Sequence, residues 1–527
     1  MTQSRQSLSA RIAVADCETD PFNGTTDIKP FIWGFFDGES FKTFDDTDSF
    51  VDFIRGFSGV CFAHNGGKFD WHFILDKLDK RRKVHITNGR IARARIGKCE
   101  IRDSWSILPI PLGAYQKDSI EYWKFTAEHR GKYIDEITEY LRGDCVYLHR
   151  LISEFYARFP AQMTLASTSM KVWAQMSGRE IPRASPGFDS TIRPFYFGGR
   201  VEAFSTGIIT GEHTIADINS AYPAAMMKQH PWGFKYNVGT RIDDSAIERS
   251  FIRFTGLSRG ALPVRMADKS LAFPERFGEY WATGHEIKSG LETNTIRIER
   301  ITEVYEWLET IDFGEYITRF FEEKSRAKDK GDKEGYLFAK LFMNSLYGKF
   351  AANPAKYKEY KIDGQYNEPD AEWLPAGNID GDYAFFARPI PPSAQRFFNV
   401  ATAASITGRV RAYLLESLHA VTRPVYCDTD SIIAVEASNL TQSDTLGDWS
   451  VEARPDRLAI AGKKLYAAWQ AGNVVKLASK GVRLSADEIE KVARGQTVSY
   501  NSLAPTFSIG RGRFITSRTI RGLTNGH

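Results

Sequence analysis

The stretch YCDTDSIIAV, residues 426–435, places Asp428 and Asp430 between two apolar runs. These runs predict the two strands of a tight hairpin, and acids two apart in an extended chain lie on the same face. A third acid, Asp217, ends another apolar run and opens DINSAYP, residues 217–223. Carboxylates at strand ends suit Mg²⁺, and two such ions about 4 Å apart stabilise the attacking and leaving oxygens of an in-line displacement. A simple acidic turn is the alternative, because aspartate is common in turns.

The stretch KLFMNSLYGKF, residues 340–350, lies between these acidic segments and predicts a helix. Lys340, Asn344 and Tyr347 are spaced so that they share one helix face. A cation, an amide and an aromatic ring on one face suit a triphosphate with a base to stack on. The alternative, a solvated face with a single tyrosine, does not explain why Gly348 follows so closely.

Taken in order, the three stretches resemble the polymerase motifs of family B DNA polymerases, DxxSLYP, KxxxNSxYG and YxDTDS, with Ala221 where the family usually has leucine. The resemblance implies that Asp217 and Asp430 are the main metal ligands, that Asp428 assists and that the Ile218 carbonyl contributes. The implied cofactor is Mg²⁺, two ions in each active site, for which Mn²⁺ can substitute.

The same resemblance implies a site for a deoxynucleoside triphosphate. Lys340 would hold the phosphates, where a cation offsets charge that grows in the transition state, and Lys324 is a less direct partner. Tyr222 would lie under the sugar and leave no space for a 2′-hydroxyl, the group that distinguishes RNA from DNA building blocks. The implied substrate-binding residues are Ser220, Tyr222, Lys324, Lys340, Asn344 and Tyr347.

A second group of acids lies near the N-terminus. Asp16 and Glu18 are two apart at a strand end, Asp70 closes HNGGKFD, and Tyr140 and Asp144 are four apart on a predicted helix. Such a set can bind two metal ions and orient a water against a phosphodiester, although each acid alone is more often a surface residue. The patterns DxE, NxxxFD and YxxxD resemble those of the 3′–5′ proofreading exonucleases fused to family B polymerases, whose fold is ribonuclease-H-like.

Other positions match residues that hold the frayed primer end in those exonucleases. They are Thr19, His64, Asn65, Phe69 and Ser104. Lys117 and Tyr122 fall where the phage members carry a catalytic lysine and a tyrosine. Lys117 would stabilise charge on the scissile phosphate, or it is an ordinary solvent-facing lysine.

Long gaps between the polymerase motifs leave room for two insertions. The protein-primed branch of the family, found in phages with linear genomes and in mobile elements, has insertions at these places. In that branch the first supports docking of a terminal protein and DNA, and the second is a hairpin that closes around the template and parts the downstream strands. PFYFGGR and KKLY resemble the YxGG and KxY motifs of this branch, which implies DNA contacts by Tyr196, Gly198, Gly199, Lys464 and Tyr466.

The predicted fold class is a multidomain α/β and α+β chain. A ribonuclease-H-like exonuclease domain would span residues 1–185, and a right-hand polymerase domain with two insertions would span 186–527. The predicted parts of the second domain are the palm (about 190–238 and 393–455), first insertion (about 239–314), fingers (about 315–353), second insertion hairpin (about 355–392) and thumb (about 456–527). Local patterns predict strands at 11–15, 31–36 and 60–63 and helical stretches at 135–159, 315–350 and 397–419.

Composition is that of an ordinary globular protein of three or four structural units, with 527 residues, 42% hydrophobic, and 69 Lys and Arg against 65 Asp and Glu. Five dispersed cysteines argue against a disulfide framework and suit a reducing compartment. No signal peptide or membrane span is visible, which predicts a location in the cytoplasm, that of a bacterial host for a phage or mobile-element protein. The expected partners are template and primer DNA, deoxynucleoside triphosphates and a terminal protein, with the chain acting as a monomer.

Three other interpretations were weighed against a protein-primed polymerase with proofreading and strand displacement. A relative that starts synthesis without a protein primer would carry the same insertions. A non-catalytic DNA-binding scaffold would be expected to lack metal ligands, and none of the implied ligands is missing. A nuclease without polymerase activity would leave Lys340 and Tyr347 unexplained.

Overall fold

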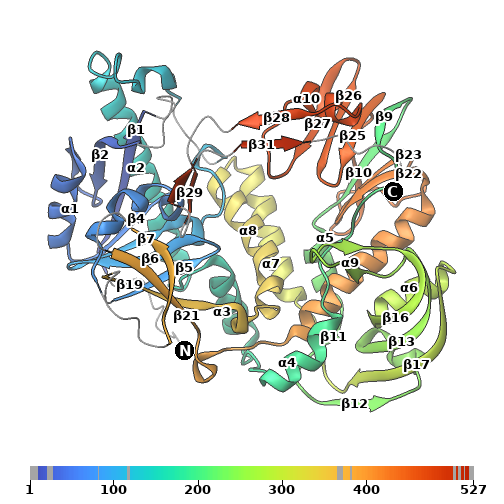
Figure 1. The fold of residues 1–527 in the computed structure, drawn as a ribbon. Coiled ribbons are helices and arrows are strands. Elements are labelled where there is room, and N and C mark those ends of the chain that lie inside the picture. The colour runs from blue at the N-terminus through green and yellow to red at the C-terminus, as the bar shows by residue number, and fades with distance from the viewer. Residues whose placement is uncertain are drawn as a thin grey trace.

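The computed structural model describes residues 10–20, 28–80, 82–114, 119–364, 372–379, 383–501, 506–508, 512–514 and 517–520. Lys117 lies outside these ranges, so its role stays a prediction. Figure 1 shows an N-terminal unit on the left, the helices α7 (Gly314–Asp329) and α8 (Lys333–Phe350) in the middle, and the remaining sheets on the right.

A ten-stranded sheet forms the N-terminal unit, and β1 is one of its inner strands, between β4 and β2. β1 pairs parallel with β4 and antiparallel with β2, which places Asp16 and Glu18 well inside the unit. Helix α2 packs on β1 and β2 through apolar residues such as Ile137 and Leu148. The elements of this unit are β1 (Ile12–Thr19), β2 (Pro30–Phe36), β3 (Phe41–Phe44), α1 (Thr47–Gly56), β4 (Val60–Ala63), β5 (Lys83–Thr87), β6 (Arg90–Ile96), β7 (Cys99–Asp103), α2 (Ile134–Arg158) and α3 (Leu165–Ser177).

The last three strands of this sheet come from far along the chain: β19 (Lys358–Gly364), β20 (Leu374–Asn378) and β21 (Tyr383–Pro389). The predicted hairpin at 355–392 is therefore present, but it does not stand apart from the N-terminal unit. β19 pairs with β5, with Tyr360 opposite Val84, and Ile362 and Phe385 join the same hydrophobic core as Ile101. Local sequence shows the hairpin, whereas its pairing with β5 depends on contacts hundreds of residues apart.

A five-stranded central sheet lies in the second half of the chain, in the order β24, β10, β23, β22 and β8. The predicted hairpin at 425–435 is confirmed as β22 and β23. Helix α9 is buried on nearly all sides, as expected for a helix enclosed by neighbouring elements. The bounds are α4 (Pro186–Ile192), β8 (Val201–Ala203), β10 (Thr214–Ile218), α5 (Ala221–Met226), α9 (Val400–Ala420), β22 (Thr422–Asp428), β23 (Ser431–Glu436) and β24 (Trp449–Ala453).

The helical stretch predicted at 315–350 is two helices rather than one. Gly331 adopts a left-handed conformation with φ of +68° after α7 ends, a geometry that favours glycine. Asp332 then caps α8 by accepting a hydrogen bond from the Gly335 N–H. The two helices pack side by side as an antiparallel pair, which brings their lysines to one side of the central sheet.

The first insertion forms a four-stranded sheet of β12 (Tyr236–Gly239), β17 (Ile296–Trp307), β13 (Ser250–Arg259) and β16 (Glu275–Thr283), with α6 (Gly284–Glu292) packed against it and against α9. Smaller strands in this half of the chain are β11 (His230–Pro231), β14 (Val264–Arg265), β15 (Leu271–Ala272) and β18 (Thr310–Ile311). The gap between the motifs thus holds a sheet of its own, whose hydrophobic cores include Val400 and Leu415 of α9.

The C-terminal sheet contains β27 (Asn473–Ser479), β26 (Leu465–Gln470), β25 (Arg457–Gly462) and β9 (Gly207–Thr210), with α10 (Ala486–Ala493) against it. The prediction that all of 190–238 belongs to the palm is wrong for β9, because Ile209 pairs with Leu458. Gly207, with φ of +97°, redirects the chain out of the central sheet. Beyond α10 come β28 (Val498–Asn501), β29 (Thr506–Ser508), β30 (Gly512–Phe514) and β31 (Ser517–Ile520), and β29 lies against the turn at 66–68.

The five cysteines are free and buried, in keeping with the expectation from their spacing. Among the helices that the structure describes, none is long and apolar enough to cross a membrane.

Candidate active sites

The three acids of the polymerase motifs meet at one end of the central sheet. β10 and β23 are antiparallel neighbours, with Asp217 opposite Ser431. The Ile218 N–H donates to the Asp430 carbonyl at 2.7 Å, so the end of β10 is fixed to the hairpin turn. Asp428 ends β22 directly before that turn. The structure therefore brings together the acids that the sequence places more than two hundred residues apart.

Burial and mutual repulsion make this pair of acids costly to ionise. Burial, followed by the charges of Asp430 and Glu452, raises the pKa of Asp217 to about 7. Burial also raises the pKa of Asp430, with a contribution from Asp428. A cation between Asp217 and Asp430 would relieve this repulsion. Glu452, on β24, was missed in the sequence because it lies in no motif.

Asp428 has a different surrounding from the other two acids. The Lys464 ammonium contacts both of its carboxylate oxygens at 2.6 Å. The Lys464 N–H donates to the Tyr426 hydroxyl, and the Tyr426 ring lies 4.8 Å from that of Tyr466. Asp428 is thus already paired with a cation, which leaves Asp217 and Asp430 as the pair open to a metal ion. The Tyr466 side chain is buried, and its contact with the primer strand stays a prediction.

The glycines of the YxGG-like stretch fit against the hairpin turn. A Cβ atom at Gly199 would lie 2.6 Å from the Thr429 hydroxyl oxygen, so only glycine fits there without a shift. Thr429 itself has φ of +61°, and its N–H donates to the Arg200 carbonyl at 2.6 Å. A Cβ atom at Gly198 would make an ordinary contact with the Leu271 side chain at 3.9 Å, and the Tyr196 carbonyl accepts a hydrogen bond from Arg265. Close packing thus accounts for Gly199, while DNA contacts by this stretch stay a prediction.

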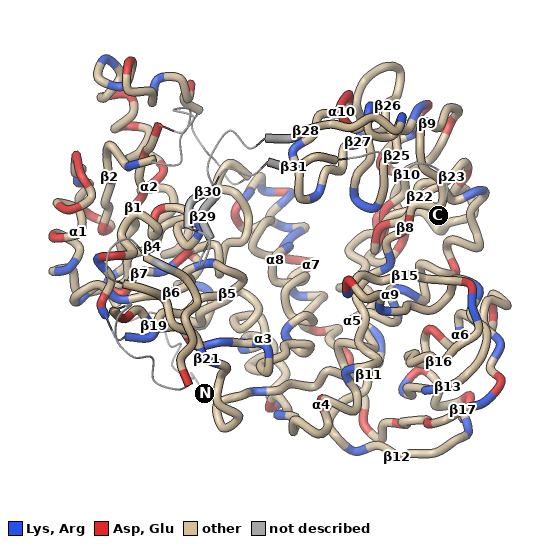
Figure 2. Tube along the Cα trace, in the orientation of Figure 1, with Lys and Arg blue, Asp and Glu red and all other residues tan. Residues whose placement is uncertain are grey.

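A cavity of about 520 Å³ opens beside Asp217 and Asp430. Its opposite wall is formed by α7 and α8, which contribute three lysines. Figure 2 shows basic positions on α7 and α8 and acidic positions gathered at the central sheet. The charged and amide-bearing residues that line the cavity are Asp217, Asn219, Lys324, Lys328, Lys340, Asn344, Asp430 and Asp444. Ser220 and Ile218 also line it.

Three of these lining residues were missed in the sequence. Lys328 lies four residues after Lys324 on the same helix, and this spacing could have identified it. Asn219 lies inside DINSAYP and could also have been found, whereas Asp444 lies in a loop without a motif. Burial, Lys340 and Lys328 lower the pKa of Lys324, which shows how closely the three cations are grouped.

Two tyrosines from different elements stack beside this cavity. The rings of Tyr222, on α5, and Tyr347, on α8, are 4.3 Å apart and nearly parallel, at 7°. Ser220 precedes α5 in a left-handed conformation with φ of +55° and redirects the chain from β10 into this helix. On α8 the Asn344 amide donates to the Lys340 carbonyl at 2.8 Å. Four of the six predicted substrate-binding residues thus line the cavity, namely Ser220, Lys324, Lys340 and Asn344, whereas Tyr222 and Tyr347 do not.

The N-terminal acids also converge. The Cys17 N–H donates to the Asp70 carboxylate at 3.2 Å, which ties Asp70 to the strand of Asp16 and Glu18. Burial raises the pKa of the Cys145 thiol, and so do the charges of Asp16, Asp144, Glu18 and Asp70, the four predicted ligands. Burial, Asp144 and Glu18 likewise raise the pKa of Tyr140. Burial raises the pKa of Asp70 to about 6, despite its hydrogen bonds.

Neither acidic site is a complete protein cage for a metal ion. Among the described residues, no group of three or more His, Cys, Asp or Glu side chains is arranged to hold one. The donor chemistry nevertheless fits Mg²⁺, which commonly binds through one or two carboxylates and completes its shell with waters and substrate phosphates. The half-buried, mutually repelling pair of Asp217 and Asp430 meets this requirement.

The predicted DNA-binding residues of the N-terminal unit form a connected group. His64 shares hydrogen bonds with the Ser104 hydroxyl at 2.9 Å and the Ile110 carbonyl at 3.0 Å. The Asn65 side chain accepts from Arg90 at 2.8 Å, and Arg90 also pairs with the buried Asp103 at 2.7 Å. Arg90 was missed in the sequence because it lies on β6, outside the motifs.

The other predicted contacts in this unit differ in exposure. Thr19 is buried at the end of β1, and the Phe69 ring packs edge-on against Phe73 at 5.3 Å. Tyr122 is 54% exposed and is therefore accessible to a DNA strand.

Comparisons with known proteins identify the family of this chain. A family model described as DNA polymerase type B, organellar and viral, matches residues 113–372. The DNA-directed DNA polymerase of Enterobacteria phage PRD1 is 39% identical over 560 residues, an alignment that covers 99% of each chain. The DNA polymerase of Bacillus phage Nf is 25% identical over 77% of this chain and 74% of its own.

A solved structure shares the fold. Phi29 DNA polymerase complexed with primer-template DNA superposes with a TM-score of 0.73 at 17% identity, covering 97% of this chain and 100% of that one. This confirms the predicted fold class, a multidomain α/β and α+β chain. Because a phage polymerase matches nearly its whole length at 39% identity, the chain belongs to the organellar and viral type B DNA polymerases.

Proposed function

We propose that this chain, a member of a family of DNA-directed DNA polymerases, extends a DNA primer on a DNA template and removes mispaired ends by 3′–5′ excision. The observation that supports extension is the cavity in which Asp217 and Asp430 face Lys324, Lys328 and Lys340. Acids that attract metal ions and lysines that attract a polyanion line the same space, which suits a metal-bound nucleoside triphosphate.

Asp217, Asp430 and the Ile218 carbonyl would hold Mg²⁺ or Mn²⁺, which when bound stabilises the attacking and leaving oxygens. Lys340, supported by Lys324 and Lys328, binds the triphosphate and offsets the charge that develops on the leaving group. The carboxylate and carbonyl oxygens of Asp217, Asp430 and Ile218 are the basis for proposing a metal site here.

Selection of deoxynucleotides is assigned to Tyr222. Its ring is held by the stack with Tyr347 and by burial, so it cannot move aside at little cost. A rigid ring under the sugar would clash with a 2′-hydroxyl, and we therefore expect ribonucleotides to be rejected.

Excision is assigned to the N-terminal acids. The charges of Asp16, Glu18, Asp70 and Asp144 all raise the pKa of the buried Cys145 thiol, and the Cys17 N–H ties Asp70 to the strand of Asp16 and Glu18. These acids would hold Mg²⁺ against the terminal phosphodiester, while the group around His64 and Asn65 holds the unpaired end. Lys117 and Tyr122 are proposed to assist there.

Primer extension tests the proposal directly. The intact chain with Mg²⁺, a primed template and deoxynucleoside triphosphates is expected to lengthen the primer, and Asp217→Asn is expected to stop this. Asp487→Asn, an exposed acid on α10, is the matched control and should extend normally. Extension by Asp217→Asn at the normal rate would contradict the assignment.

Initiation on a terminal protein is proposed from the first insertion, whose sheet lies across α9 from the central sheet (Figure 1). Synthesis on a linear template in the presence of such a protein, with the first nucleotide becoming protein-linked, would support it. Synthesis on an unprimed circle without any protein primer would instead favour the self-priming alternative.

The proposed setting is the cytoplasm of a bacterial host, with the chain acting as a monomer.

Strand displacement is proposed from the hairpin of β19 to β21. Deleting the whole hairpin would remove three strands from the N-terminal sheet, so a sharper test replaces only residues 365–382 with a short turn, which removes the edge strand β20 and keeps β19 and β21. This variant is expected to make short products on duplex templates while adding single nucleotides normally. Products of unchanged length would contradict the proposed role.

A further inference from the structure

A second cavity, of about 480 Å³, lies between α5, α9 and the loop at 446–448. Ile218 is the one lining residue that it shares with the cavity around Asp217 and Lys340. None of the polymerase or exonuclease roles proposed above uses its other lining residues.

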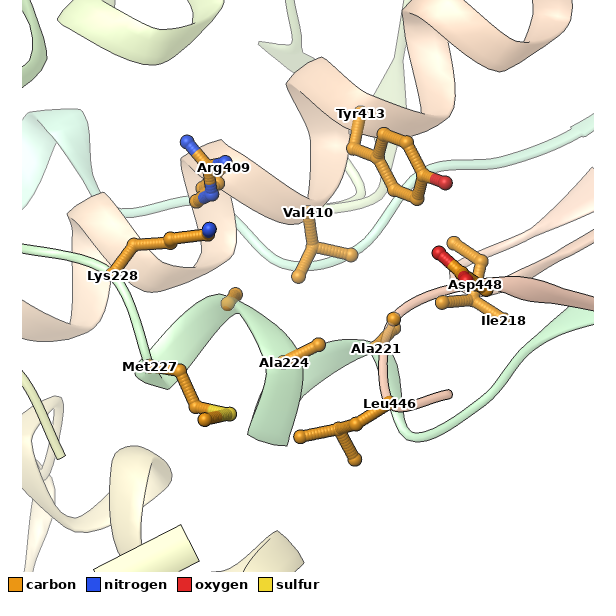
Figure 3. Close-up of a pocket in the computed structure, with 12 residues that line it drawn as sticks. Ile218, Ala221, Ala224, Met227, Lys228, Arg409, Val410, Tyr413, Leu446 and Asp448 are labelled. Carbon is orange, nitrogen blue, oxygen red and sulfur yellow. The ribbon is translucent and has the colours of Figure 1, made fainter. Parts of the chain in front are cut away.

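One end of this cavity carries basic side chains and the other carries an acid and a tyrosine (Figure 3). Lys228 and Arg409 lie at one end, and Tyr413 and Asp448 lie at the other. Within the described part of the chain, neither the Lys228 nor the Arg409 side chain has an ion-pair or hydrogen-bond partner, although other arginines on the same molecule, such as Arg253, are paired. Two neighbouring cations without a carboxylate favour an external anion.

The wall between the ends is apolar. Ala224, Met227, Val410 and Leu446 face the space, and Met227 is 40% exposed. Flat rings pack well against aliphatic and thioether side chains, and the flexible methionine can adapt to them. The space lies within the size range of small-molecule sites.

We infer that this cavity binds a nucleoside monophosphate whose base carries an amino group. The phosphate monoester, with about two negative charges at neutral pH, would lie between Lys228 and Arg409. The base would pack on the apolar wall, and its amino group would donate to Asp448. Two cations match one phosphate group, whereas the three lysines of the first cavity match a triphosphate.

Two backbone hydrogen bonds join the loop of the second cavity to Asn219 of the first, so an assay must tell binding in the two cavities apart. The Gly447 N–H donates to the Asn219 carbonyl at 2.8 Å, and the Asn219 N–H donates to the Asp448 carbonyl at 2.9 Å. Asn219 lines the first cavity. Variants of each cavity are therefore needed in the same experiment.

Calorimetric titration of the full chain with dAMP, in buffer containing EDTA, tests the inference. Saturable binding at one site is expected, and Arg409→Ala and Lys228→Ala should each weaken it roughly tenfold. Because Lys228 is exposed, its variant reports on binding even if Arg409→Ala folds poorly. Lys98→Ala, an exposed lysine of the N-terminal unit, and Lys340→Ala, in the first cavity, should bind dAMP normally.

A second arm tests recognition of the base. The 5′-monophosphate of purine deoxyriboside, which lacks the amino group, should bind more weakly than dAMP, and Asp448→Asn should reduce this difference. Loss of dAMP binding in Lys340→Ala but not in Arg409→Ala would place the nucleotide in the first cavity and overturn the inference. Binding of inorganic phosphate as tightly as dAMP, or no saturable binding, would also overturn it.

Discussion

The two acidic sites use the same ligand chemistry but face different surroundings. At the central sheet, Asp217 and Asp430 face three lysines across a cavity. In the N-terminal unit, the charges of the acids raise the pKa of the buried Cys145 thiol, and the predicted DNA-binding residues His64 and Asn65 are held by hydrogen bonds. The lysine wall suits a highly charged triphosphate, whereas the hydrogen-bonded side chains of His64 and Asn65 suit an unpaired strand end. Under the proposed function, the residues near the acids would distinguish the building of DNA from its trimming.

The largest expected effect separates the two sites through Asp430. Asp430→Asn is expected to lower primer extension roughly a thousandfold or more, because one of the two open carboxylates is lost. Excision of a single-stranded oligonucleotide by the same preparation should continue. Equal loss of both activities would mean that the two sites are not independent.

The reciprocal change is Asp16→Asn. Excision is expected to fall roughly a thousandfold while extension stays within a few-fold of the original chain. Degradation of a labelled 3′ end measures the first activity and primer extension the second. Asp135→Asn, an exposed acid on α2, should retain both.

The lysine wall can be tested at Lys340. Lys340→Ala is expected to reduce kcat/KM for deoxynucleoside triphosphates roughly a hundredfold and to leave excision unchanged. Steady-state incorporation of one nucleotide measures this, with the exposed Lys333→Ala on the same helix as control. An equal fall in excision would argue against the distinction between the two sites.

Sugar selection depends on Tyr222. Tyr222→Val removes the ring and its stack on Tyr347, and we expect discrimination against ribonucleotides to fall roughly tenfold to a hundredfold. The measurement is the ratio of kcat/KM for dCTP and CTP, with the exposed Tyr357→Val as control. An unchanged ratio would assign selection to another residue.

The smallest effect is expected at Arg90, a positioning residue for Asn65. The same guanidinium nitrogen of Arg90 donates to Asn65 and to Asp103. Because the lysine side chain is one atom shorter, Arg90→Lys keeps a charge but should hold Asn65 less firmly, so excision should require roughly fivefold more single-stranded DNA for half-maximal rate. Arg93→Lys, on the same strand, is the matched control. Extension should not change in either variant.

Much of both sites could be predicted from the sequence, because their residues occur in short ordered motifs. Strand and helix patterns placed Asp217, the 425–435 hairpin and the helix of Tyr140 and Asp144 correctly. Pairings between distant segments could not be predicted: β9 with β25, and β19 with β5, depend on chain reversals and shared cores rather than on local periodicity. Residues outside motifs, such as Glu452 and Arg90, were missed for the same reason.

The pairing of β19 with β5 also limits how this protein can be divided. A fragment starting at residue 186 would keep the hairpin but lose its neighbouring strand, leaving an open strand edge beside apolar Ile362 and Phe385. Such edges recruit other chains, so the isolated C-terminal fragment is expected to aggregate. Inactivating excision by a point substitution, rather than by truncation, is therefore the sound way to obtain the polymerase alone.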